Sequence, residues 1–363
     1  MDTLPRAIAL LCSRFFYRFA LAAFLAALLP AEAGRAEVST MRVVGSGEAT
    51  SRNASDRILL VSTRSLGTRC DAAAMAGGLR CERRGGDGRW ESLSWNDVLT
   101  DFAAEPLPTV IYVHGNRVEN GADKPHGLEF YRWLSARRPV GTPMRYVIWS
   151  WQSSQVRGRI KDYEVKAARC QPCGWQLAWA IDQLPSESPL AVVGYSYGAR
   201  LTTAALHVLG GGQIGSLGLS ERVHPDRPPV RAALVAAAVD ANWLRPGGRH
   251  DHALRQVDHL LLVNNQRDPA MRFYPISPVG RHASALGYAG VPGRDSLGDV
   301  ASRIHSIDMT EAVGRHHALG EYLGASSMLA RAMVRVVDVP AATGTPNVDA
   351  SSLAERDASG GLQ

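Results

Sequence analysis

One short segment constrains the fold of this chain more than any other. Residues 190–193 are apolar and typical of a buried strand, and residues 199–208 are mostly small or apolar and favour a helix. Between them the sequence reads Gly-Tyr-Ser-Tyr-Gly, with Ser196 at the centre. This spacing predicts a sharp turn that exposes the serine hydroxyl, because Gly194 and Gly198 let the strand and the helix approach closely. The structural alternative is a buried serine that begins a helix.

A nucleophilic serine requires hydrogen-bond donors for the oxyanion that forms when it attacks a carbonyl group. The backbone N–H of Tyr197, directly after the serine, is the first predicted donor. Residues 109–113 form another strand-like run that ends in His114-Gly115-Asn116, and the N–H of Asn116 is the second predicted donor. We expect His114 to pack or hydrogen-bond beneath this loop.

The two motifs together, HGN and GYSYG, resemble those of the α/β-hydrolase superfamily of serine hydrolases. The chain is most similar to a poorly characterised, exported bacterial branch, over about residues 57–334. The resemblance implies an α/β-hydrolase fold, with a mostly parallel sheet and helices on both faces. It also implies the chain order serine, acid, histidine. The stretch between Asp240 and His259 is too short for a large cap domain.

Two aspartates follow strand-like runs downstream of the serine. Asp268 follows residues 259–263, where the superfamily usually places its acid, and this resemblance favours it. Asp240, at the end of residues 231–239, is the alternative acid. A plain turn or helix-capping aspartate is the structural alternative for Asp268.

The base is expected after the last strand, which residues 302–308 predict by their alternating pattern. The pair His316-His317 follows. In the branch that the chain resembles, the histidine stands five residues before a tyrosine, which selects His317. His316 remains the alternative, and His305 is a poorer candidate because it lies inside the predicted strand.

The remaining segments predict an alternation of strands and helices, which is typical of a mostly parallel sheet. A helix over residues 160–184 is expected to be interrupted near Pro172. Residues 270–300, rich in Gly, Pro and Ser, predict a loop over the site. Tyr274, Leu286 and Tyr288 in that loop are candidates for lining a substrate.

The N-terminus predicts export. Arg6, Arg14 and Arg18 precede the apolar residues 19–29, and Ala31-Glu32-Ala33 fits a cleavage site after Ala33. We therefore expect a signal peptide (residues 1–33), a loose segment (34–56), one domain (57–338) and a disordered tail (339–363). The apolar stretch is shorter than the ~20 residues of a membrane span. The mature protein is thus expected in the periplasm or outside the cell, with an uncleaved N-terminal anchor as the alternative.

Four cysteines follow this leader, an even number that suits an oxidising compartment. The expected disulfides are Cys70–Cys81 and Cys170–Cys173, while a redox pair or half of a zinc site are the alternatives for the second pair. His250-Asp251-His252, with His259 nearby, matches no zinc signature, so no metal or other cofactor is expected. The net charge of +6 comes from scattered arginines and forms no basic stripe, which argues against nucleic acid as a partner.

These observations predict an exported serine hydrolase that cleaves a small or lipid-like ester through an acyl-enzyme. Ser196 is the expected nucleophile, His317 the base and Asp268 the residue that orients the base. Amides and thioesters are second choices of substrate. The alternative functions are an acyltransferase and a non-catalytic binding protein of the same fold.

Overall fold

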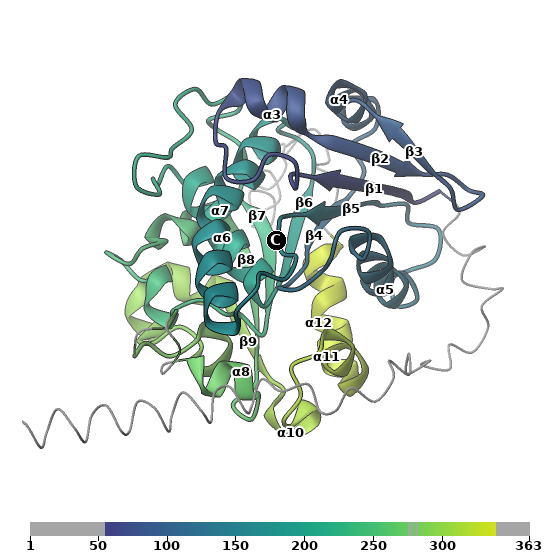
Figure 1. The fold of residues 1–363 in the computed structure, drawn as a ribbon. Helices are drawn as coiled ribbons and strands as arrows, with labels where there is room; N and C mark the ends of the chain where they lie inside the picture. Colours follow the sequence, from purple (N-terminus) through teal and green to yellow (C-terminus); the bar gives the residue numbers. More distant parts are fainter. Residues whose placement is uncertain (1–54, 275–276, 278, 281, 339–363) are drawn as a thin grey trace, which may run out of the picture.

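The computed structural model describes residues 55–338 except 275, 276, 278 and 281 (Figure 1). The predicted signal peptide (1–33) and tail (339–363) lie outside the described residues, as does nearly all of the predicted loose segment (34–56). The structure therefore bears on the predicted domain alone.

A nine-stranded sheet forms the centre of the molecule, in the order β3-β2-β1-β5-β4-β6-β7-β8-β9 (Figure 1). From β1 to β9 every neighbouring pair is parallel, whereas β2 and β3 add an antiparallel edge. The strands are β1 (Arg57–Ser62), β2 (Arg80–Arg84), β3 (Trp90–Leu93), β4 (Thr109–Val113), β5 (Arg145–Ser150), β6 (Leu190–Tyr195), β7 (Val230–Val235), β8 (Val257–Asn264) and β9 (Ile304–Asp308).

Helices cover both faces of the sheet, and the predicted α/β architecture is confirmed. In Figure 1, α6 and α7 lie on one face and α5, α11 and α12 on the other. The helices are α3 (Ala72–Gly78), α4 (Trp95–Ala104), α5 (Asp123–Ser135), α6 (Arg159–Gln183), α7 (Tyr197–Leu209), α8 (Pro269–Arg272), α9 (Leu286–Ala289), α10 (Thr310–Val313), α11 (Leu319–Ala325) and α12 (Ser327–Val337). Short 3₁₀ helices add η1 (Ala241–Leu244), η2 (Asp251–Gln256) and η4 (Arg294–Arg303). Among the described residues, no helix is both long and apolar enough to cross a membrane.

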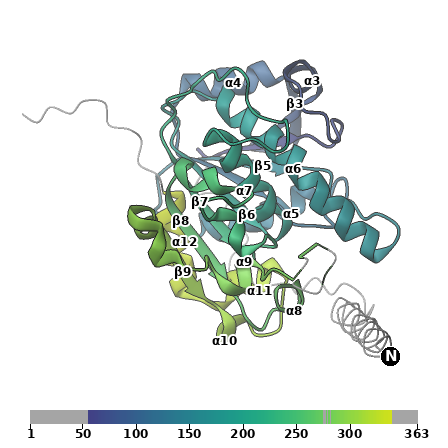
Figure 2. The same cartoon turned by 90° about the vertical axis from the view of Figure 1, so that its left-hand side faces the viewer.

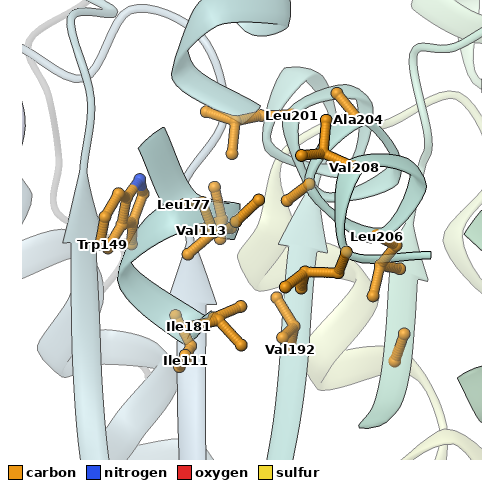
Figure 3. Close-up of a cluster of buried hydrophobic side chains, with 14 of the residues drawn as sticks. Ile111, Val113, Trp149, Leu177, Ile181, Val192, Leu201, Ala204, Leu206 and Val208 are labelled. Carbon is orange, nitrogen blue, oxygen red and sulfur yellow. The ribbon is translucent and has the colours of Figure 1, made fainter. Parts of the chain in front are cut away.

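Each face of the sheet has its own apolar core. On one face, side chains of α6 and α7 pack on β4, β5 and β6, with Leu177, Leu201 and Trp149 among them (Figure 3). A Cβ on Gly174 of α6 would lie 2.5 Å from the Cβ of Ala204, so α7 leaves no space for a larger residue at this position of α6. On the other face, buried side chains of α5, α11 and α12 cover the sheet. Fully burying one large apolar side chain stabilises a fold by about 1.5–3 kcal/mol, so these two layers hold the strands in place.

The strand order reverses between β4 and β6. From β4 the chain continues to β5 on one side, and it then crosses to β6 on the other side of β4. In parallel α/β sheets, ligands bind outside the carboxyl ends of the strands at such a reversal. The loops after β4 and β6 carry Asn116 and Ser196, so the two sequence motifs meet at this point. Figure 2 shows that α8, α10 and α11 gather at one end of the molecule.

Two predictions about local structure are wrong. Helix α6 runs from Arg159 to Gln183 with Pro172 inside it, so the predicted interruption near Pro172 is absent. The turn that a Cys170–Cys173 disulfide was expected to staple therefore does not exist, and both cysteines are buried free thiols on one continuous helix.

The predicted Cys70–Cys81 disulfide is wrong as well, because both residues are free thiols. Cys81 lies in β2, paired with Val61, whereas the Cys70 thiol donates to the Pro172 carbonyl oxygen of α6 at 3.5 Å. Both side chains lie in or against the same apolar core, but each has its own partners there and the two thiols form no bond. Burial raises the pKa of the Cys70, Cys81 and Cys170 thiols to about 12, which keeps these thiols protonated and unreactive.

Candidate active site

The turn around Ser196 is strained and tightly packed. Ser196 has φ 54° and ψ −117°, a backbone conformation that non-glycine residues rarely adopt, and it lies between the end of β6 and the start of α7. A Cβ on Gly198 would lie 2.1 Å from the carbonyl oxygen of Val113, and one on Gly194 would lie 2.7 Å from the Cα of Ala199. Both positions therefore exclude any larger residue, and the geometry is that of the strand–turn–helix motif.

The loop after β4 packs directly beneath this turn. A Cβ on Gly115 would lie 2.9 Å from the Tyr195 ring and 3.3 Å from the Cβ of Ser196. His114 is fully buried; its Nδ1 lies 2.9 Å from the Gly115 oxygen and its ring stacks on Trp151. Burial lowers the pKa of His114 well below its usual value, so the ring is neutral. His114 therefore supports the loop and does not reach Ser196.

Two backbone amides flank the serine from these two loops. Within the described residues, neither the Asn116 N–H nor the Tyr197 N–H donates to another protein atom. The side chain of Asn116 is occupied, since its Oδ1 accepts from the Arg117 N–H at 2.9 Å. Both amides are thus available as donors to a ligand oxygen.

The structure brings together Ser196, His317 and Asp268. The Ser196 Oγ lies 3.0 Å from His317 Nε2, and His317 Nδ1 lies 2.6 Å from Asp268 Oδ2. A proton on Nδ1 that is donated to the carboxylate leaves Nε2 free to accept from the serine hydroxyl. This is the relative arrangement of nucleophile, base and orienting acid that acyl transfer requires.

Every oxygen of the Asp268 carboxylate is occupied. Asp268 caps α8, where its Oδ1 accepts from the Ala270 N–H at 2.9 Å and the Met271 N–H at 3.4 Å. Its Oδ2 accepts from Tyr322 Oη at 2.8 Å as well as from His317. The helix-capping alternative for Asp268 is therefore correct, and this fully buried side chain caps α8 through Oδ1 while its Oδ2 bonds to His317.

Tyr322 is a site residue to which sequence reasoning assigned no role. In the sequence, its position five residues after His317 selects that histidine, and this spacing is the signal that could have marked Tyr322 as a site residue. Burial, and then the charge of Asp268, raise the pKa of Tyr322, so its phenol keeps the proton that it donates.

The alternative acid, Asp240, and the alternative base, His316, make no hydrogen bond to Ser196 among the described residues. Asp240 accepts from Tyr274 Oη at 2.5 Å, and Arg200 Nη1 donates to the same phenol oxygen at 2.7 Å. Asp240 thus forms a hydrogen-bonded network with Tyr274 and Arg200. It makes no hydrogen bond to His316 or His317 among the described residues. His316 is exposed, whereas His317 is partly buried.

A second contact holds the histidine segment against β6. Tyr195 Oη donates to the backbone oxygen of His317 at 2.5 Å, and the two rings lie 5.6 Å apart between centroids. Because Tyr195 precedes Ser196, the residue next to the serine also positions the histidine.

A cavity of about 200 Å³ opens beside Ser196 and His317. Aromatic and apolar side chains form most of its wall, with a few polar groups. The wall consists of Asn116, Arg117, Tyr163, Tyr195, Ser196, Tyr197, Ala238, Ala270, Met271, Tyr274, Ser277, Val279 and His317. Of the predicted substrate-lining residues Tyr274 is present. Leu286 is instead buried in the core, and Tyr288 packs behind the wall.

The histidines considered for metal binding are engaged within the protein. His250 is fully buried, with Nδ1 3.0 Å from Thr203 Oγ1 and Nε2 3.1 Å from Gln171 Oε1. Among the described residues, no group of three or more His, Cys, Asp or Glu side chains is arranged to hold a metal ion.

No family profile matches the chain, and no curated protein matches it. One similar solved structure, a bifunctional GH43-CE protein from Bacteroides eggerthii, has 14% identity and a TM-score of 0.32, over 64% of this chain and 34% of that one. Another, a lipase-esterase related protein from Clostridium acetobutylicum, has 11% identity and a TM-score of 0.25, over 64% of this chain and 95% of that one. The match thus spans about a third of the length of the first structure. TM-scores this low carry no argument about activity.

Proposed function

We propose that this protein is a serine hydrolase of the α/β-hydrolase fold that cleaves a carboxylic ester through an acyl-enzyme. The observation that carries the proposal is the continuous hydrogen-bonded path from Ser196 Oγ through His317 to Asp268, with contacts of 3.0 Å and 2.6 Å. The strained turn at Ser196 and the two available amides support it.

Acylation begins when Ser196 Oγ attacks the ester carbonyl carbon and His317 Nε2 takes the hydroxyl proton. Asp268 stabilises the imidazolium that forms. The carbonyl oxygen becomes an oxyanion, and the N–H groups of Asn116 and Tyr197 donate to it. When this intermediate collapses, the C–O bond to the leaving group breaks and His317 returns the proton to the departing alcohol.

Deacylation repeats the same steps with water. His317 Nε2 takes a proton from water as its oxygen attacks the acyl-enzyme carbonyl carbon, and the bond to Ser196 Oγ then breaks. The acid leaves and the serine regains its proton. A cavity of about 200 Å³ with an aromatic wall suits a small acyl or alkyl group, since a site of about 150 Å³ already holds a benzene ring.

Covalent labelling tests the proposal. A fluorophosphonate probe should label the wild-type protein, and Ser196→Ala should abolish labelling and lower kcat on a short 4-nitrophenyl ester by about 10⁴-fold or more. Ser302→Ala is the matched control, because the Ser302 hydroxyl is exposed and donates to the Asp299 oxygen, away from the cavity lining that the structure describes. Unchanged ester turnover in a folded Ser196→Ala protein would refute the nucleophile.

The histidine pair gives a second test. His317→Ala should be as damaging as Ser196→Ala, because members of such a triad act as one unit. His316→Ala should retain activity, since this exposed side chain has no contact with the serine among the described residues. The reverse result would move the base to His316.

Adding an alcohol acceptor separates hydrolysis from acyl transfer, because an acyltransferase would form the new ester in preference to the free acid.

We also propose that the protein is exported and cleaved after Ala33, on the basis of the arginines and apolar residues of its N-terminus. Intact-mass measurement of protein from the periplasm or the medium should give a chain that begins at Gly34. A chain that keeps Met1 and stays with the membrane would favour the N-terminal anchor.

A further inference from the structure

Among the described residues that line the cavity beside the serine, one is an arginine, Arg117. Arg117 directly follows Asn116, and its backbone has a positive φ of 57°. The Arg117 N–H donates to the Ser153 oxygen at 2.9 Å and to Asn116 Oδ1 at 2.9 Å. These contacts hold a backbone conformation that costs energy in a non-glycine residue. The side chain therefore leaves the loop after β4 in a fixed direction, and it lines the cavity.

Among the described residues, the guanidinium of Arg117 is hydrogen-bonded through its Nε alone. Its Nε donates to Asp162 Oδ2 at 3.0 Å, and its Cζ lies 5.2 Å from the centre of the Tyr163 ring. Neither terminal amino group has a hydrogen-bond partner among the described residues. The side chain is 32% exposed, whereas that of Asp162 is 0% exposed. The two free amino groups thus form a preorganised donor pair of the kind that binds a planar anion.

The charge of Arg117 is only partly compensated. Asp162 forms a second, fully buried ion pair with Lys166, and its Oδ1 also accepts from the Val156 N–H at 2.7 Å. One carboxylate therefore serves two cations. Burial opposes the charge of Asp162, but the hydrogen bonds from Lys166, Val156 and Arg117 outweigh it and lower its pKa. Glu119, a carboxylate two residues after Arg117, is exposed and accepts from the Gln155 N–H.

The described wall of the cavity carries no acidic residue that would repel an anion. Apart from His317, Arg117 is its one side chain with a basic group. Because the rest of the wall is mainly aromatic and apolar, a charge placed against Arg117 is weakly screened by water. An anionic group on a ligand therefore gains more here than it would on an open surface.

We propose that Arg117 binds a carboxylate carried by the substrate, so that the preferred substrate is an ester with a second, free carboxylate a few bonds from the scissile carbonyl. This inference rests on the proposed ester hydrolysis at Ser196. It names the substrate class and assigns to Arg117 the role of selecting it. A neutral acyl chain of the same length leaves the two amino groups of Arg117 without a partner and is hydrolysed more slowly.

Matched esters test this selection. The 4-nitrophenyl monoester of adipic acid carries a carboxylate, and 4-nitrophenyl heptanoate has a neutral chain of similar length. The glutarate monoester and the hexanoate ester form a shorter pair. Ser196→Ala measures the spontaneous hydrolysis of each ester, which is subtracted. The quantity compared is the ratio of kcat/KM for the acidic ester to kcat/KM for its neutral partner.

Wild-type protein should prefer the acidic ester of at least one pair. Arg117→Gln should lower that ratio by roughly 10- to 100-fold, the range for hydrogen bonds to a charged group. Taking the ratio within each variant cancels any loss that both esters share. Arg117→Lys should keep part of the preference, because it keeps the charge but lacks the planar fork. Arg267→Gln is the matched control, since Arg267 pairs with Glu311 at the surface, and it should leave the ratio unchanged.

The outcomes separate the two proposals. Fluorophosphonate labelling together with a ratio of one or less in the wild type, or with a ratio that Arg117→Gln does not change, overturns the inference and leaves the hydrolase proposal in place. Labelling without turnover of any of the four esters also overturns it, since the inference requires that an acidic ester be cleaved. Absence of both labelling and turnover overturns the proposed function itself.

Discussion

Replacing Tyr322 by Phe removes one hydroxyl and leaves the ring in place. In the wild type, Tyr322 Oη donates to Asp268 Oδ2 at 2.8 Å, and both groups are fully buried. The same oxygen accepts from His317 Nδ1 at 2.6 Å. Loss of the phenol donor therefore leaves His317 as the one remaining partner of Oδ2 among the described residues, and the carboxylate is then held by three hydrogen bonds instead of four.

A hydrogen bond to a charged group contributes about 1.5–3 kcal/mol. We expect Tyr322→Phe to lower the free energy of unfolding by about that amount, because no water replaces the donor at a buried site. We expect kcat to fall by roughly 10-fold, since part of this energy orients the imidazole through Asp268. KM should change little, because Tyr322 does not line the described cavity wall.

The assay combines urea unfolding with kcat and KM on one 4-nitrophenyl ester and with the rate of fluorophosphonate labelling. Tyr131→Phe is the matched control, because Tyr131 Oη also donates to a carboxylate, that of Asp56, at 2.9 Å and away from the site. This control should lose stability and keep kcat. A folded Tyr322→Phe protein whose kcat and labelling rate stay within twofold of wild type, on the order of the error of such comparisons, would refute the positioning role and leave a purely structural one.

Three further predictions follow from the geometry. Asp268→Asn should lower kcat/KM by about 10⁴-fold through loss of the carboxylate that orients His317, whereas Asp240→Asn should be mild because Asp240 bonds to Tyr274; an inactive Asp240→Asn protein would contradict the assignment. The four described cysteines should not react with a thiol reagent in the folded protein, and all four should react once the protein is unfolded, even without a reductant. An intact mass two hydrogens below the reduced mass for each cysteine pair would instead indicate disulfides. Burial lowers the pKa of His114 and His250 well below 6.5, so the unfolded chain binds protons that the folded protein does not, and stability should fall as the pH decreases below 6.5. Urea titrations at about pH 7.5 and about pH 5.5 should give free energies of unfolding that differ in that direction, by up to ~1.4 kcal/mol per pH unit per histidine, and a free energy of unfolding that rises on acidification would contradict it.

The elements that sequence reasoning predicted are those whose constraints are local. The strand, turn and helix around Ser196 depend on glycines two residues away, and the loop at Asn116 depends on the strand before it. Asp268 and His317 lie far from Ser196 in the sequence, so only the assumed chain order of the resemblance linked them. The structure then placed them within hydrogen-bond distance.

The features that escaped prediction depend on packing between distant segments. The phenol of Tyr322 and the ion pair of Arg117 with Asp162 join residues whose proximity has no signature in the sequence. The disulfides were wrong for the same reason, since an even number of cysteines says nothing about which thiols face each other. Helix α6 continues through Pro172 because its buried face packs on α7 and the sheet, and this tertiary contact outweighs the local preference against proline.

The hydrogen bond from Tyr195 to the His317 oxygen has a consequence for the order in which the protein becomes reactive. The turn with Ser196 is bonded to the end of β7, where the Ser196 N–H donates to the Val235 oxygen, whereas His317 precedes α11, near the end of the described residues. That helix is held by Trp133 of α5, whose Nε1 donates to the Leu323 oxygen at 2.7 Å. On the mechanism proposed above, the serine has no base beside it until α11 docks there. A partly folded chain in which α11 is undocked should therefore be chemically inert.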